Sequence, residues 1–263
     1  MKRREFLTKT LAATTVAGLS SVTLNAGGAG TTREYYELRI YRLKPGASHE
    51  LLDTYLEKAA IPAWNRLGIK PVGVFTEVQP KGDPSIYVLI PYPSIDSFVT
   101  AAARLDADTE YQKAAAEYLH TDKTNPAYER IDSSLLLAFA GMPKLEQPAY
   151  SRGKTPRIFE LRTYQSHNEL KALKKIDMFN TGEIDTMRET GMGPIFYGQC
   201  LVGSGLPHLV YMLSAENEQA RGRHWEIFSK HPVWLKLKDD PQYADTVSKI
   251  DFVILKPLAC SQI

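Results

Sequence analysis

Two kinds of hydrophobic periodicity alternate along most of the chain. Apolar residues at every second position predict strands, and apolar residues three or four positions apart predict helices. In the first half, this pattern predicts a helix at 49–67, a second helix running in pieces from Ser94 to 119, and strands at 36–42, 72–78, 86–90 and 134–140. The order of these elements is strand, helix, strand, strand, helix, strand.

The second half of the sequence repeats the first at an offset of 123 positions. The shift places Glu37, Leu38, Arg39 and Tyr41 on Glu160, Leu161, Arg162 and Tyr164, and Gly68 and Pro71 on Gly191 and Pro194. A constant offset across several elements indicates a true internal repeat. The elements of the second copy are predicted at 158–164, 169–190, 195–202, 209–213, 216–237 and 252–255.

The repeated order of elements predicts the fold class. Strand-helix-strand-strand-helix-strand is the ferredoxin-like plait, in which helices cover one face of an antiparallel sheet. The sheet order is 4-1-3-2, so the first strand is central and the second and fourth are edges. We therefore predict an α+β protein with one plait at 33–141, a linker rich in proline at 142–156 and a second plait at 157–260.

The first strand of each plait carries charges on one face. Glu37, Arg39 and Tyr41 alternate with apolar residues, so the two sets point to opposite sides of the sheet. We expect the apolar side to meet the helices. The charged side would then lie in the space between the two sheets, opposite its counterpart in the second plait, which consists of Glu160, Arg162 and Tyr164.

These six residues form the main candidate site. Two arginines and two glutamates inside the molecule could bind a small anionic or zwitterionic ligand, because arginine offers a bidentate fork. The interpretation that we favour is a buried charge network that fixes the packing of the two sheets, since such networks specify structure more than they stabilise it.

A second cluster of candidate residues lies in the last predicted helix of the second plait. It consists of His224, Trp225 and His231, of which His231 precedes a proline that starts a new helical turn. Imidazole is a common ligand of haem and metals, but the seven-residue spacing of the two histidines does not favour a metal site. We expect no metal, and the sequence has no hydrolase, P-loop or dinucleotide-binding signature that would indicate catalytic residues.

The N-terminus differs in composition from the rest. Residues 1–29 begin with Lys2, Arg3 and Arg4, continue with a short apolar stretch and carry a net charge of +3, against +2 for the whole chain. This order is typical of a signal peptide, and the paired arginines resemble a twin-arginine export signal. We expect export to the bacterial periplasm by the twin-arginine machinery, no stable membrane span, and no binding of nucleic acid because no basic stripe remains. Cys200 and Cys260 are not expected to pair.

Several motifs resemble those of the NIPSNAP family. They are the repeated Tyr/Phe-Glu-Leu-Arg-x-Tyr strand, Gly-Ile-Lys-Pro-Val and Gly-Met-Gly-Pro-Ile before the second strands, and Trp225-Glu-Ile-Phe228 with His231-Pro-Val-Trp234. The resemblance covers nearly all of the chain after residues 1–29. It implies a dimeric α+β barrel, which is pseudo-dimeric in this case because the two plaits belong to one chain. It implies a protein of undefined role, for which we expect small-ligand binding or assembly, including homo-oligomers. The alternative is a monooxygenase-like enzyme, either free of cofactor or dependent on haem.

Overall fold

The strands of the two repeats form one closed barrel. The computed structural model describes residues 32–44, 48–80, 82, 84–151 and 156–263. Around the barrel, the strands follow the order β1-β3-β2-β8-β5-β7-β6-β4. Each half has the predicted ferredoxin-like order, since the neighbours run β4-β1-β3-β2 in the first repeat and β8-β5-β7-β6 in the second. The predicted fold class is confirmed.

The elements of the first repeat agree closely with their predicted ranges. Its strands are β1 (Tyr35–Arg42), β2 (Gly73–Glu77), β3 (Ser85–Tyr92) and β4 (Arg130–Ala138). The first predicted helix is present as α1 (Glu50–Tyr55), the π-helical turn η1 (Leu56–Ala60) and α2 (Ile61–Arg66). The second is in three pieces, α3 (Ile95–Asp106), α4 (Thr109–Ala114) and α5 (Ala116–Leu119).

The second repeat places equivalent elements at the same offset. Its strands are β5 (Ile158–Gln165), β6 (Gly193–Val202), β7 (His208–Ala215) and β8 (Lys249–Pro257). Its helices are α6 (Glu169–Met178), the π-helical turn η3 (Phe179–Glu183), α7 (Ile184–Glu189), α8 (Glu218–Ser229) and α9 (Pro232–Lys238), followed by the 3₁₀ turn η4 (Pro241–Tyr243). The π-helical turns therefore occupy equivalent places in the two repeats.

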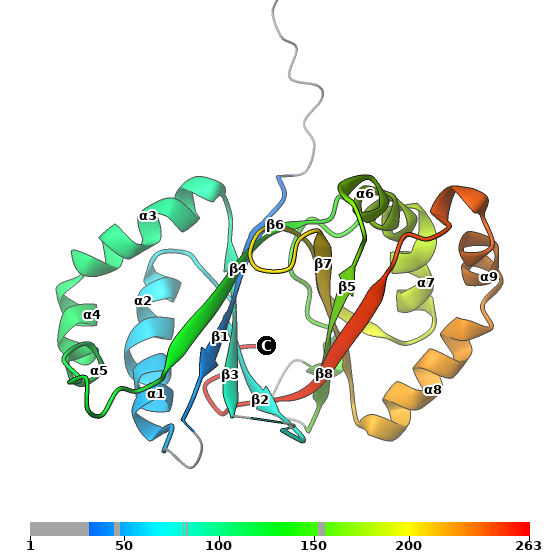
Figure 1. Ribbon diagram of the computed structural model, residues 1–263. Helices are drawn as coiled ribbons and strands as arrows, with labels where there is room; N and C mark the ends of the chain where they lie inside the picture. The colour runs from blue at the N-terminus through cyan, green and yellow to red at the C-terminus, as the bar shows by residue number, and fades with distance from the viewer. Residues whose placement is uncertain (1–31, 45–47, 81, 83, 152–155) are drawn as a thin grey trace, which may run out of the picture. The chain divides into compact units, whose positions relative to one another are not determined.

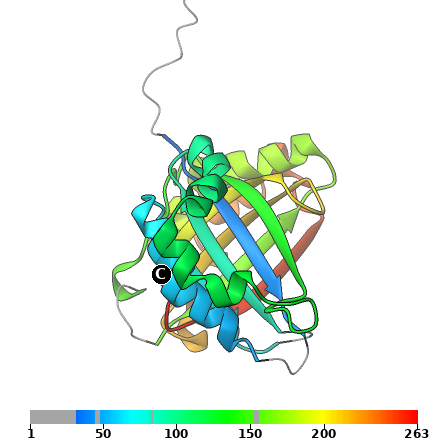
Figure 2. The same cartoon turned by 90° about the vertical axis from the view of Figure 1, so that its left-hand side faces the viewer.

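The edge strands of each sheet pair with those of the other. β2 lies antiparallel to β8, and β4 lies antiparallel to β6, so no edge of either sheet is left unpaired. Helices α1–α5 cover the outer face of the first sheet and α6–α9 that of the second (Figure 1). Figure 2 shows the first helical layer lying across the strands behind it. The barrel interior and the two helix-covered faces are thus three separate packing regions.

The charged face of the central strands points the opposite way from our prediction. Tyr36 and Leu38 pack inside the barrel with Phe75, Phe159 and Leu161. Tyr41 instead packs in the core beneath the helices of its own repeat, and Arg39 lies over the ring of Trp64 in α2. The six charged and aromatic residues therefore form two separate groups outside the barrel, not one network between the sheets.

The physical reason lies in the closure of the barrel. Once the edges pair, the barrel interior is surrounded by sheet on all sides, where few donors are at hand to compensate a buried charge. The helix-covered face receives side chains from the sheet and from the helices, and together these supply guanidinium, indole and hydroxyl donors. Alternation along a strand separates two faces but does not say which of them meets the helices.

Local signals mark the ends of the helices in the first repeat. Ser94 caps α3 by accepting the N–H of Ser97 at 3.1 Å, and Gly68, with φ of +79°, follows the end of α2. At the start of α1, the Oγ of Ser48 accepts the N–H of Glu50.

The segment between the repeats packs against the barrel. Met142 is fully buried, the N–H of Leu145 is donated to the Glu34 carboxylate at 2.8 Å, and a 3₁₀ turn, η2 (Ala149–Ser151), follows. Both cysteines are free: Cys200 lies in the barrel core, whereas Cys260 packs beneath the helices of the first repeat. Within the described ranges, no helix has the length and apolar character needed to cross a membrane.

Candidate functional site

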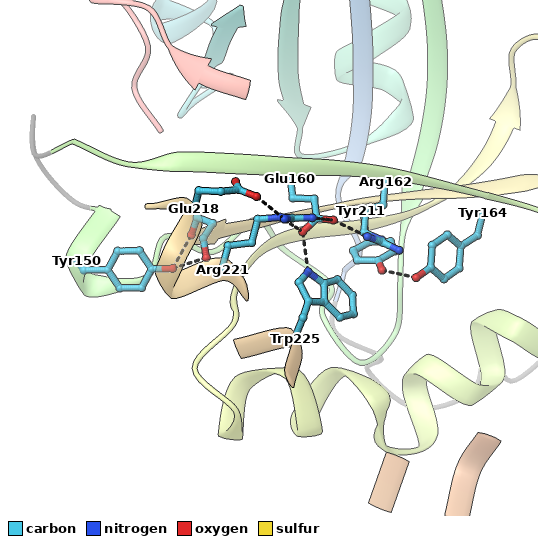
Figure 3. A network of polar contacts seen from close by, with 9 residues as sticks. Tyr150, Glu160, Arg162, Tyr164, Tyr211, Glu218, Arg221 and Trp225 are labelled. Atoms are coloured by element: carbon cyan, nitrogen blue, oxygen red, sulfur yellow. Dashed lines mark hydrogen bonds and ion pairs between the residues drawn. The ribbon is translucent and has the colours of Figure 1, made fainter. Parts of the chain in front are cut away.

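Glu160 is the centre of the polar network in the second repeat. Its carboxylate accepts the Nε–H of Arg221 at 2.7 Å, an Nη2–H of the same arginine at 2.9 Å and the indole N–H of Trp225 at 2.7 Å. Arg162, two residues along β5, donates a fourth hydrogen bond. Figure 3 shows these side chains converging on one carboxylate, with two of them coming from α8.

Electrostatics keep this carboxylate ionised. Burial acts to raise the pKa of Glu160, but the hydrogen bond from Arg221, the charge of Arg162 and the hydrogen bond from Trp225 hold it below its ordinary value of 4.5. The guanidinium carbon of Arg162 also lies 4.5 Å from the centre of the Trp225 ring. Helix α8 is therefore fixed to the sheet by charge-assisted hydrogen bonds and by cation–π contact.

Glu37 occupies the equivalent position in the first repeat, with different partners. Arg39 donates to it through Nε at 2.6 Å and Nη2 at 2.9 Å. The hydroxyls of Ser133 and Tyr92 complete the set at 2.8 Å and 3.1 Å. All of these donors belong to the sheet, so helix α3 contributes none of them.

The register of the strands explains the difference. Ser133 faces Arg39 across β1 and β4, and the residue that faces Arg162 in the same way is Phe252. Likewise Tyr92 faces Tyr35 in the first repeat, and Ala215 takes its place in the second. Phe252 and Ala215 have no hydroxyl to donate, and Glu160 instead receives its donors from α8.

The helix above each carboxylate differs accordingly. Helices α3 and α8 both have 12 residues and begin at capped, equivalent positions. The fourth and eighth residues of α8 are Arg221 and Trp225, and those of α3 are Phe98 and Ala102. The larger pair fills the space over the sheet in the second repeat, and the smaller pair leaves it open.

The result is a cleft in one repeat only. A cleft of about 670 Å³ lies between the first sheet and helices α1–α5, with Glu37 and Arg39 among its lining residues. The space beside Glu160, Arg221 and Trp225 measures only about 10 Å³, roughly the room that one water needs. Ligand pockets usually measure about 300–1,000 Å³, so of these two equivalent spaces the one in the first repeat has a suitable size and the one in the second does not.

Aromatic side chains form much of the cleft wall. Trp64, Tyr92 and Phe98 line it together with Tyr55 and Tyr111, whose hydroxyls lie 3.0 Å apart. Tyr55 also stacks on Tyr118, with ring centres 3.6 Å apart. Tyr41, a predicted site residue, is fully buried and is not among the lining residues. Sequence reasoning missed most of these aromatics, which lie on helices and on β3.

The structure separates the second group of predicted site residues. Trp225 is a donor to Glu160, and His224 lines the small space beside it, where its Nδ1 is buried without a partner among the described residues. His231 lies further on, where its Nδ1 caps α9 by accepting the N–H of Val233 and its Nε2 lies 3.4 Å from Glu189. Tyr164 accepts a hydrogen bond from Tyr211 at 2.8 Å.

A buried ion pair in the second repeat was not predicted. Lys175 and Glu183 are 3% and 1% exposed, and Nζ of the lysine lies 2.6 Å from the carboxylate. Burial raises the pKa of Glu183, although Lys175 opposes this shift. The equivalent residues of the first repeat are Leu52 and Ala60. Lys175 falls in a helix otherwise patterned as amphipathic, so only comparison of the repeats would have singled it out.

Two other kinds of site come into question in the described part of the chain, a second hollow and a metal-binding cluster. A hollow of about 820 Å³ lies between the linker and the start of β6, but it contains none of the predicted site residues. Arg188, its only basic lining residue, pairs with Glu146 and Asp185. Across the described ranges, no group of three or more His, Cys, Asp or Glu residues could hold a metal ion.

Solved structures with a similar fold extend over most of the chain. A provisionally assigned monooxygenase from Lactobacillus acidophilus has a TM-score of 0.57 at 9% identity, covering 86% of this chain and 94% of its own. Another, from Fusobacterium nucleatum, has a TM-score of 0.54 at 8% identity, covering 87% and 94%. At such identities the similarity shows the fold alone, which is that of the dimeric α+β barrels. No functionally curated protein matches the chain.

Sequence comparison identifies the family. An uncharacterised NIPSNAP-like domain protein from Burkholderia xenovorans is 22% identical over 40% of this chain and 88% of its own, with a TM-score of 0.36. The sequence profile of the NIPSNAP family matches this chain twice, at residues 36–140 and 159–262. Because these two matches span well over half of the sequence, the chain belongs to the NIPSNAP family.

Proposed function

We propose that this protein binds a small molecule in the cleft of its first repeat. The observation that carries the proposal is the difference between two equivalent places in one barrel. In the second repeat, Arg221 and Trp225 fill the space above the sheet. In the first, the space is open, of ligand size and lined by five aromatic side chains among others. The second repeat then serves as the structural partner that closes the barrel.

The second repeat suggests a substitution that tests this function. The Ala102→Trp variant places in α3 the side chain that fills the second repeat, and Ala102 is exposed, so the fold should tolerate it. The matched control is Ala103→Trp, since Ala103 is exposed on the same helix but does not line the cleft. Each protein would be titrated with a neutral dye, Nile red, and an anionic one, anilinonaphthalene sulfonate.

We expect at least one dye to bind with a stoichiometry of one, and Ala102→Trp to abolish that binding while Ala103→Trp keeps it. Dye binding that is the same in all three proteins, or absent from all three, would refute the proposal. The experiment does not depend on the identity of the natural ligand.

An enzyme of the monooxygenase-like kind is the second candidate, and it would use the same cleft. The favouring observation is the shared fold of the two provisionally assigned monooxygenases. Haem fits this cleft poorly, because none of the described residues that line it is a histidine, cysteine or methionine. The tyrosines of the cleft are engaged elsewhere, since Tyr55 and Tyr111 are hydrogen-bonded to each other and Tyr92 donates to Glu37. Turnover of a bound aromatic compound, lost in Ala102→Trp, would favour this candidate.

We also propose export, on the basis of residues 1–29, which lie outside the described ranges. The twin-arginine signal is read by its receptor through the paired arginines, Arg3 and Arg4. Replacing both with lysine should leave the protein in the cytoplasm of a bacterial host, as measured by fractionation. Equal periplasmic amounts of the two proteins would contradict this route.

A further inference from the structure

The charge at the base of the cleft is balanced. Glu37 and Arg39 form a bidentate pair, so together they carry no net charge. Each oxygen of Glu37 also accepts one hydroxyl, from Ser133 or Tyr92. A carboxylate has about four acceptor positions, and all four are therefore used. A ligand ammonium group would find no free acceptor on Glu37 and would meet the charge of Arg39.

An anionic ligand is also disfavoured. Among the described residues that line the cleft there is no lysine, and the charged ones are Glu37, Arg39 and Asp106, with a net charge of −1. Burial raises the pKa of Tyr92 and Tyr55, so their hydroxyls stay neutral. A second carboxylate beside Glu37 would share one arginine with it and be repelled by both acidic residues.

At the base of the cleft, beside Glu37, the remaining polar capacity is for donation. The side chain of Arg39 is 26% exposed, in contrast to 12% for Arg162, and a guanidinium has donors only. An acceptor oxygen that enters the base of the cleft could therefore hydrogen-bond the exposed part of the Arg39 guanidinium.

We propose that the cleft takes a neutral, ring-containing molecule whose carbonyl or similar acceptor oxygen meets Arg39, in preference to a free carboxylate. The rings would pack against Tyr92, Phe98 and Trp64. This inference rests on the proposed function, which it deepens by naming the class of ligand. It also differs from the anionic or zwitterionic ligand that the sequence left open as the alternative to a structural network, because Glu37 neutralises the arginine.

Three naphthalene compounds of similar size test the class. 2-Acetonaphthone is neutral with a carbonyl acceptor, 2-naphthoate is its anionic counterpart, and 2-ethylnaphthalene has no acceptor. Equilibrium dialysis of each against the whole protein would give three dissociation constants, with Ala102→Trp and Ala103→Trp as the filled variant and its control. We expect the ketone to bind about tenfold more tightly than the carboxylate and measurably more tightly than the hydrocarbon.

The outcomes separate the two proposals. Ketone preference that is lost in Ala102→Trp and kept in Ala103→Trp supports both. If 2-naphthoate binds most tightly, or if the ketone and the hydrocarbon bind equally, the proposed ligand class is wrong even though the cleft binds. If none of the three compounds binds in a manner sensitive to Ala102→Trp, the ligand class is again overturned, and the dye titrations then decide whether the cleft binds anything.

Discussion

The two repeats supply hydrogen-bond donors to an equivalent buried glutamate in two different ways, and only one of them leaves a cleft. Both place a buried glutamate at the same point of a central strand and surround it with four donors. The first repeat takes its donors from the sheet, and the second takes three of them from helix α8. When the sheet is sufficient, the helix is free to carry small or apolar residues, and space opens between them.

A similar contrast occurs deeper in the helical layers. The first repeat packs Leu52 and Ala60 where the second buries the ion pair of Lys175 and Glu183. The lysine lies 4.6 Å above the ring of Phe179 and 5.4 Å from that of Trp234. The second repeat thus relies on buried polar groups at two places, and the first at one.

Breaking the buried pair should have the largest effect on stability. Lys175→Leu leaves Glu183 buried without its partner, and we expect it to lower the free energy of unfolding by roughly 3–5 kcal/mol. The double variant Lys175→Leu/Glu183→Ala reproduces the first repeat and should regain most of this loss. Urea denaturation measures both. A single variant as stable as the wild type would show that the pair has no such role.

Removing the two side chains that fill the space over Glu160 should have the next largest effect on stability. Arg221→Phe/Trp225→Ala removes three of the four hydrogen bonds to Glu160 and should destabilise the protein by roughly 2–4 kcal/mol. Adding Phe252→Ser and Ala215→Tyr supplies hydroxyls at the positions that serve Glu37, and should recover part of the stability. Dye titration should then count two sites. A fourfold variant no more stable than the double one would contradict the equivalence of the two donor sets.

A single donor in the first repeat should matter less. Tyr92→Phe removes the hydroxyl that lies 3.1 Å from the Glu37 carboxylate and keeps the ring in place. Since a buried acceptor loses one of four donors, we expect a loss of about 1–2 kcal/mol in the free energy of unfolding. Thermal and urea denaturation measure it. No change in stability would mean that water replaces the hydroxyl without penalty.

The smallest effect concerns pH. The pKa of Glu160 is lowered on folding, so its ionised form contributes stability that is fully present above its ordinary pKa of 4.5. This contribution is lost as the pH falls through the folded-state value. The free energy of unfolding should therefore decrease on acidification below about pH 4.5, and less steeply in Glu160→Gln. Parallel slopes in the two proteins would contradict this contribution.

The fold was predictable because its signals are local and occur twice. Glycines such as Gly68 and Gly191, both with positive φ, and the period of the strands recur at one offset, and the plait order follows from them. The direction of the charged face was not predictable from alternation. Tyr36 and Tyr41 lie on opposite faces of one strand, yet both are almost fully buried, because barrel and helices bury both sides.

The cleft was predictable only in part. Glu37 and Arg39 were identified, since charges in a central strand are unusual. Most of the wall residues, however, come from helices whose faces look like ordinary core. One signal was available: the offset that aligns the repeats pairs Ala102 with Trp225 and Phe98 with Arg221. A difference of that size between two copies of one helix position over the sheet indicates space in one of them.

The closed pairing of β2 with β8 and of β4 with β6 has an evolutionary consequence. A barrel made from two identical chains must change both halves with every mutation, so any substitution that fills one cleft fills the other. In a single chain with two repeats, this symmetry is no longer enforced. One half can specialise in recognition while the other accumulates substitutions, such as Trp225 and Lys175, that serve only the scaffold.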